Sequence, residues 1–137
     1  MIIKEIEALI PHRAPFLYVD KLVSTTKDKI VGIMSFPGND QFLNGSFPQF
    51  SFVPGAILIE AIAQCGGAGI KKLGMADGLF GLANIETARF HAGVEYERIF
   101  TMIIRNIKVT ERYLKQTAKG YVDKNLCVEL TWTCVKF

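Results

Sequence analysis

The chain has 137 residues, half of them hydrophobic and about a fifth charged. This length and balance predict one compact domain over residues 1–137, with a core large enough to need no metal or disulfide framework for stability. The net charge of +3 is small, and the basic residues are scattered along the chain. These features argue against a nucleic-acid-binding protein.

Cysteine usage and the N-terminus indicate the cellular compartment. Cys65, Cys127 and Cys134 are odd in number, widely spaced and not accompanied by a histidine cluster. We expect buried thiols in a reducing compartment rather than disulfides or a zinc site, and no metal or other cofactor. The first residues carry two acids, Glu5 and Glu7, and no long apolar run, which is unlike a secretion signal. The prediction is a cytoplasmic protein without a membrane partner.

The first third of the chain predicts a short helix, a hairpin and a loop. Residues 3–10 have amphipathic helical spacing, and the proline that follows ends the helix because it cannot continue the hydrogen-bond ladder. Strands are expected at residues 16–23 and 29–36, joined by a charged turn at 27–29. Residues 37–52 mix glycine, proline, asparagine and four phenylalanines without a period, so we expect an ordered loop whose phenylalanines are buried.

A second helix is predicted over residues 56–70, in which Glu60 is the one charged residue. The segment is too short to cross a membrane, so we expect a helix buried on all sides inside the protein. Pro54 suits the first helical position. The segment contains Gly66, Gly67 and Gly69. Each would cost a helix about 1 kcal/mol relative to alanine, so we expect a sheet packed closely against them.

The remaining sequence predicts strands at residues 79–89, 98–109, 114–123 and 127–137. The last strand alternates β-branched and aromatic residues with others, and residues 123–125 suit a hairpin turn. The order of elements indicates an α+β fold in which a curved antiparallel sheet encloses one long helix.

Two unusual features come together near the start of the second helix. The backbone N–H groups of Gly55 and Ala56 have no intrahelical partner there and can polarise a carbonyl. Glu60 follows by little more than one turn in an apolar segment, where burial disfavours the charged form and suits a general acid. A buried glutamate is more often paired with arginine or used as a cap, but the free helix start and the ordered loop favour function. Gln64, one turn further, suits structural hydrogen bonding and support of the site equally.

These residues resemble the signature of bacterial 3-hydroxyacyl-acyl-carrier-protein dehydratases. That signature has Gly-His-Phe-Pro-Gly, a proline two positions on, then Pro-Gly, an aliphatic run, Glu and Ala-x-Ala-Gln. The chain has Gly45-Ser46-Phe47-Pro48 and Pro54-Gly55, and it continues with Glu60 and Ala61-Ile62-Ala63-Gln64. The family's opening Pro-His-Arg-x-Pro-Phe-Leu-x-Val-Asp is matched by residues 11–20, and Ala88-Arg89-Phe90 resembles the strand beyond the helix. The likeness spans nearly the whole chain.

The resemblance implies a hot-dog fold and a dimer, or a trimer of dimers, with an active site at the dimer interface. In that family a histidine of one subunit removes the α-proton, a glutamate of the other protonates the departing β-hydroxyl, and a glycine N–H binds the thioester carbonyl. By position the glutamate is Glu60, the glycine is Gly55, and the histidine falls on Ser46. Residues expected to contact the substrate are Phe47, Pro54, Ala56 and Gln64.

Ser46 is the most important departure from the family pattern. A serine hydroxyl cannot take a carbon-bound proton near neutral pH without another base, and loss of a positioned base costs about 10²–10⁴ in rate. Gln49 and Ser51 stand where the family has glycine and proline, so we expect a loop of altered shape. His12 is expected to be a satisfied structural histidine and His91 a surface residue.

Three hypotheses follow for the function. The first is a dehydratase-like lyase with altered machinery, acting on a 3-hydroxyacyl thioester of acyl carrier protein or CoA in fatty-acid or related lipid or polyketide biosynthesis, with Glu60 as the main acid/base. The second is a non-catalytic or half-catalytic subunit that lends Glu60 to a histidine-bearing homologue in a heterodimer. The third is an acyl thioesterase, in which Glu60 activates water and the Gly55 N–H stabilises the oxyanion. The first is favoured over the second, and both over the third.

Overall fold

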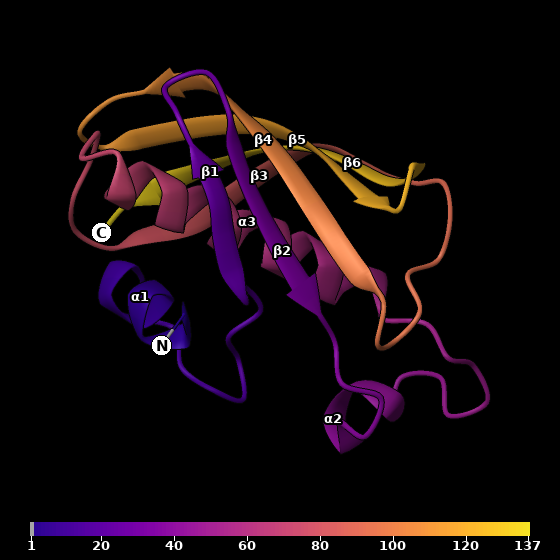
Figure 1. Ribbon diagram of the computed structural model, residues 1–137. Coiled ribbons are helices and arrows are strands. Elements are labelled where there is room, and N and C mark those ends of the chain that lie inside the picture. The colour runs from indigo at the N-terminus through magenta and orange to yellow at the C-terminus, as the bar shows by residue number, and fades with distance from the viewer. Residues whose placement is uncertain (1) are drawn as a thin grey trace.

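The computed structural model describes residues 2–137 (Figure 1). In chain order the elements are α1 (Ile2–Leu9), β1 (Lys21–Thr25), β2 (Ile30–Ser35), α2 (Gln41–Asn44), α3 (Gly55–Lys72), β3 (Phe80–Phe90), β4 (Ile99–Val109), β5 (Tyr113–Val122) and β6 (Asn125–Lys136). Within this described part, no helix is both long enough and apolar enough to cross a membrane.

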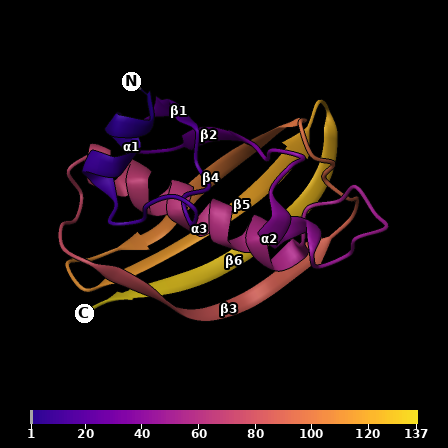
Figure 2. The same cartoon turned by 90° about the horizontal axis from the view of Figure 1, so that it is seen from below.

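The six strands form one antiparallel sheet in the order β1-β2-β4-β5-β6-β3. The sheet curves around α3, which lies along its concave side (Figures 1 and 2). β3 follows α3 in the chain but pairs with β6, so it forms an outer edge of the sheet. The arrangement is an α+β hot-dog fold, as the sequence predicted.

The core lies between α3 and the concave face of the sheet. Buried and partly buried residues alternate along β2 and β5, which is the period of two expected for strands with one face against a core. Trp132 and Phe100 are fully buried on the sheet side, opposite Leu58 and Ile62 of α3. The three cysteines are buried and free, as expected.

The glycines of α3 play two different roles. A Cβ atom at Gly66 would lie 2.2 Å from Gln116 Oε1, and one at Gly69 would lie 2.5 Å from Ile30 Cγ2. The expected close approach of the sheet is therefore confirmed at these two positions. A Cβ atom at Gly67 would have no neighbour within 4 Å, because Gly67 faces a cavity.

The prediction that α3 is buried on all sides is wrong. The sheet covers one side of the helix, while the stripe that includes Ala56, Glu60, Ala63 and Gly67 is exposed or only partly buried. These residues recur every three or four positions, so they share one face of the helix. A cavity lies along this face of the helix.

The first strand is shorter than predicted. Residues 16–20 are not part of the sheet, because Tyr18 N–H donates to the Gln64 side chain at 2.8 Å instead of to a neighbouring strand. Asp20 N–H then reaches Ile33 O at 2.9 Å, just before β1 begins. The predicted turns at 27–29 and 123–125 are confirmed.

The loop between β2 and α3 contains α2, whose start is capped by the Asp40 carboxylate. The prediction that its phenylalanines are buried is wrong: Phe42, Phe47, Phe50 and Phe52 are 73%, 60%, 58% and 45% exposed. The loop projects beyond the end of the sheet (Figure 1), where Phe47 and Phe50 pack edge-to-face on each other and the Phe52 ring lies against Gly93.

Candidate active site

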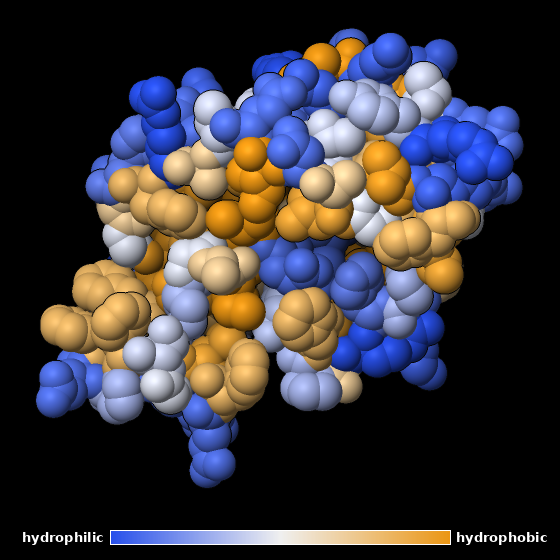
Figure 3. Space-filling model, turned by 180° about the vertical axis from the view of Figure 1, so that it is seen from behind, coloured by the Kyte–Doolittle hydropathy of each residue, from blue (hydrophilic) through white to orange (hydrophobic). Residues whose placement is uncertain are grey.

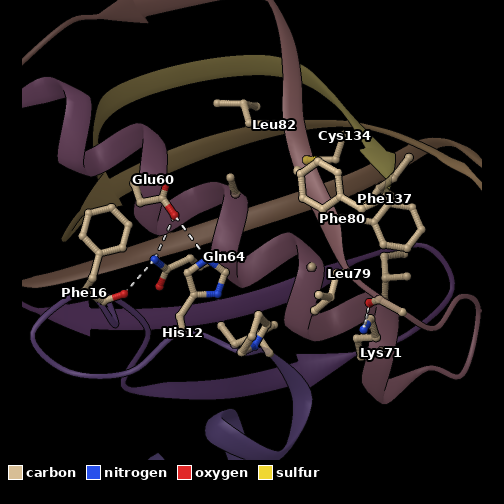
Figure 4. A pocket seen from close by; sticks show the side chains of 18 residues that line it. His12, Phe16, Glu60, Gln64, Lys71, Leu79, Phe80, Leu82, Cys134 and Phe137 are labelled. Atoms are coloured by element: carbon tan, nitrogen blue, oxygen red, sulfur yellow. Dashed lines mark hydrogen bonds and ion pairs between the residues drawn. The ribbon is translucent and has the colours of Figure 1, made fainter.

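A cavity of about 400 Å³ lies along the open face of α3. It is bounded by α3, by the connector between α1 and β1, and by the ends of β3 and β6 (Figure 4). Its volume is typical of small-molecule sites. Its walls are mainly apolar, and the larger side chains that line it include His12, Phe16, Glu60, Gln64, Lys71, Phe80, Leu82, Cys134 and Phe137.

Glu60 is the one carboxylate among the described residues that line this cavity. Its side chain is 26% exposed, and its Oε2 accepts a hydrogen bond of 2.9 Å from Gln64 Nε2. Within residues 2–137 its ion-pair partner is His12, whose Nε2 lies 3.6 Å from Oε2. The glutamate is therefore not held by an arginine, and it reaches a cavity large enough for a ligand.

Gln64 fixes the orientation of Glu60. The Gln64 side chain is almost fully buried, and its Oε1 accepts from Tyr18 N–H at 2.8 Å. Only the amide oxygen can accept that bond, so the amide nitrogen must face the other way. It donates to Glu60 Oε2 and, at 3.2 Å, to Phe16 O. Gln64 thus makes the structural hydrogen bonds that were expected and also contacts Glu60, and its support of a reaction stays a prediction.

The start of α3 presents free backbone donors. Pro54 precedes the helix and no side chain caps it, so the N–H groups of Gly55 and Ala56 lack intrahelical partners. A Cβ atom at position 55 would lie 2.9 Å from the Phe90 ring, so a larger residue there would displace that ring. Gly55 lines a separate hollow of about 420 Å³, together with Val53 and Phe90.

Ser46 and Phe47 lie on the exposed loop and do not line the cavity that holds Glu60. Ser46 follows α2, and its N–H donates to Leu43 O at 3.1 Å. Within one chain the structure therefore brings Glu60 and Gln64 together, and leaves Ser46, Phe47 and Gly55 outside their cavity.

His12 is the residue whose placement the sequence did not predict. Its Nδ1 is buried and has no hydrogen-bond partner among residues 2–137, so the prediction of a satisfied structural histidine is wrong. It lies on the connector after α1 and lines the cavity beside Glu60. The signal available in the sequence was its place in the opening motif. His91 is exposed and pairs with Glu129 at 2.8 Å, as expected of a surface residue.

The electrostatics of the cavity keep its other acidic groups protonated. Burial raises the pKa of the Cys134 thiol to about 11, the hydrogen bond with Trp132 opposes this, and the charge of Glu60 adds to it. Burial, with the negative charges of Asp40 and Glu60, also raises the pKa of Tyr18. Cys134 is therefore a neutral thiol at physiological pH and is not poised as a nucleophile.

Comparison with known proteins decides the family. A model of the FabA-like domain matches residues 10–131. The chain belongs to the FabA-like family. Among curated relatives of this FabA-like protein, the 3-hydroxyacyl-[acyl-carrier-protein] dehydratase FabZ of Coxiella burnetii is 33% identical over 141 residues, covering 99% of both chains. The FabZ protein of Clostridioides difficile is 35% identical over 126 residues, covering 90% of this chain and 89% of the relative.

Solved structures agree on the fold of this FabA-like protein. The dehydratase heterocomplex ApeI:P from Xenorhabdus doucetiae superposes with a TM-score of 0.81 at 17% identity, covering 96% of this chain and 90% of that chain. A hypothetical thioesterase with coenzyme A from Streptococcus pneumoniae gives a TM-score of 0.67 at 10% identity, covering 98% and 92%. The resemblance noted from the motifs is thus confirmed for the family and for the fold.

Proposed function

We propose that this chain dehydrates a 3-hydroxyacyl thioester of acyl carrier protein or CoA, in cytoplasmic fatty-acid or related lipid biosynthesis. The observation that carries the proposal is a single carboxylate, Glu60, held by Gln64 at the side of an apolar cavity of about 400 Å³. A cavity of this kind suits an acyl chain, and the carboxylate suits proton transfer at the chain's polar end. The dehydratase relatives support the same reaction class.

The proposed reaction is an elimination across C2 and C3 of the substrate. A base takes a proton from C2, the released electron pair forms the C2=C3 double bond, and the C3–O bond breaks. Glu60 donates its proton to the departing hydroxyl, which leaves as water. Gly55 lines a separate hollow of its own chain, so the N–H groups that stabilise charge developing on the thioester oxygen come from the start of α3 of a second chain, with Gly55 as the principal donor.

The reaction centre is completed in a dimer or larger homo-oligomer. β3 is an open edge strand that exposes Leu82, Ile85 and Phe90. Unpaired edges with apolar side chains are suited to pairing with another chain. Apolar patches also remain on the face seen in Figure 3. Pairing through this edge would bring the loop of one chain, with Ser46 and Phe47, toward the α3 face of the other.

A heterodimer is the second candidate, because Ser46 would stand at the histidine position in both sites of a homodimer. In that arrangement this chain lends Glu60 to a homologue that bears the histidine. One structural neighbour is a dehydratase heterocomplex with the same fold. Co-expression with a histidine-bearing dehydratase from the same source tests this candidate: a stable complex that turns over faster than either protein alone would support it.

The main test is conversion of a 3-hydroxyacyl thioester to its enoyl form by the purified protein. We expect turnover that Glu60→Gln abolishes. Glu111→Gln is the matched control, because Glu111 lies exposed in the turn between β4 and β5 and the chemical change is the same. Turnover that does not depend on Glu60 would refute the proposal. Release of free thiol that depends on Glu60 would favour hydrolysis instead.

A further inference from the structure

The sequence does not identify the base of the proposed elimination, and the cavity contains a candidate for it. His12 is the one imidazole that lines the cavity, and its Nε2 lies 3.6 Å from Glu60 Oε2. The two side chains face each other from different elements, the connector after α1 and the middle of α3 (Figure 4). An imidazole and a carboxylate this close can exchange a proton after a small movement brings them to hydrogen-bond distance.

We propose that His12 is the catalytic base of this protein and works with Glu60 of the same chain, so that no histidine at position 46 is needed. The inference rests on the dehydratase function proposed above. It differs from that function in where the base comes from: the same subunit as the acid, and an opening motif that lies far from Glu60 in the sequence.

The fold itself gives His12 no structural hydrogen bond. Nδ1 is buried without a partner among residues 2–137, and the ring, 30% exposed, stacks at 6.5 Å on Phe16. Buried polar atoms of native proteins are nearly always paired, and an exception needs an explanation. Stacking alone would be served as well by an apolar ring, so packing does not account for a histidine here.

The connector that carries His12 is held on both sides. Arg13, the next residue, donates to the backbone carbonyls of Ile10 and Glu7 at 3.0 Å each. Gln64 donates to Phe16 O and also holds Glu60 Oε2. One buried amide therefore links the connector to the carboxylate and fixes the distance between the two reacting groups, which is the pre-organisation that proton transfer requires.

The proton balance of the pair closes within one turnover. Neutral His12 takes the C2 proton at Nε2 while Glu60, protonated, gives its proton to the departing hydroxyl, and water is released. The pair is then an imidazolium beside a carboxylate. The two groups lie 3.6 Å apart, and once they close to hydrogen-bond distance the proton passes from Nε2 to Glu60, which restores the starting state with no net proton taken from solvent.

The other ionisable groups around His12 do not offer a competing base. Lys71 lines the same cavity, but its ammonium donates to Gly78 O. Burial raises the pKa of the Cys134 thiol to about 11, so it remains protonated. The Arg13 guanidinium is directed at backbone carbonyls. Among the described residues lining the cavity, the only carboxylate that faces the imidazole is Glu60.

Kinetics provide the first half of the test. We expect His12→Asn to lower kcat by about 10²–10⁴, the usual cost of losing a positioned base, while KM changes by only a few-fold. Ser46→His in the wild-type background should change kcat by less than about tenfold, but in His12→Asn it should restore turnover by supplying another base.

Proton NMR of the two imidazoles provides the second half and does not depend on an active variant. The chain has two histidines, so His91→Asn assigns both signals. In Glu60→Gln the ring signals of His12 should shift, because the carboxylate 3.6 Å from its Nε2 is replaced by an amide, while those of His91 should stay. In Glu111→Gln neither should move.

The outcomes separate this inference from the proposed function. His12→Asn at the wild-type rate, or His12 ring signals unchanged by Glu60→Gln, would overturn the His12 assignment and leave Glu60-dependent dehydration standing. A wild type that turns over only after Ser46→His would also overturn it, in favour of a half-site. A protein inactive in every form would overturn both.

Discussion

Substitution of Gly67 tests directly whether the cavity beside α3 is open space. A Cβ atom at Gly67 would meet nothing within 4 Å, whereas one at the neighbouring Gly66 would lie 2.2 Å from Gln116 Oε1 and 3.0 Å from Trp132. Glycine in a helix interior costs about 1 kcal/mol relative to alanine. Gly67→Ala should therefore raise the free energy of unfolding by about 0.5–1 kcal/mol, or Tm by roughly 2–5 °C.

Gly66→Ala is the matched control, because it makes the same chemical change one residue away. Its methyl group would displace Gln116, whose amide donates to Gly66 O at 3.3 Å and to Asn106 at 2.8 Å. Overpacking of this kind costs about 1–3 kcal/mol, which outweighs the helical gain. Urea unfolding of the two variants should show shifts of opposite sign. Equal destabilisation by both would refute the geometry of the cavity.

A larger side chain at the same position tests the function of the space. Gly67→Leu places an isobutyl group into the cavity, starting from a Cβ atom that has nothing within 4 Å. We expect kcat/KM for a ten-carbon 3-hydroxyacyl thioester to fall at least tenfold relative to a four-carbon substrate, because the longer chain loses its room. An unchanged ratio of the two values would show that the acyl chain does not occupy this cavity.

Three further results are expected. Gln64→Leu should cost about 1–3 kcal/mol in urea unfolding, because it strands a buried backbone N–H, and it should lower kcat by freeing the carboxylate. Burial raises the pKa of Cys65 to about 12 and of Cys134 to about 11, above the ordinary value of 9.0. As the pH rises, the unfolded state loses these protons before the folded state does. The free energy of unfolding should therefore be fully retained below about pH 9 and decline toward pH 12, by up to about 1.4 kcal/mol per pH unit for each thiol. Unfolding in a pH series measures this. Gly55→Ala should lower kcat because its methyl group meets Phe90, and Phe90→Ala should partly restore it in the same enoyl assay.

The sequence predicted the layers of the fold because hydrophobic period and chain breakers act locally. The apolar run of α3 and the alternation in the last strand follow directly from what a helix and a half-buried strand must bury. The strand predicted at residues 16–23 failed over 16–20 for a tertiary reason: Tyr18 N–H is taken by the Gln64 side chain, and no pattern in the connector encodes that partner. The glycines at 66 and 67 look identical in the sequence, and only the position of the sheet separates their roles.

The candidate site was predictable only in part. Glu60 stood out because a charge in an apolar helix is expensive, and Gln64 because it shares a helix face with it. His12 carried no such signal beyond its place in the opening motif, because it lies on a connector and its target lies on another element. By comparison with the family motif, the serine at position 46 means that the catalytic base is lost. That conclusion holds only if no other imidazole reaches Glu60. The structure places one within 3.6 Å, so the substitution at Ser46 cannot by itself be equated with loss of the reaction.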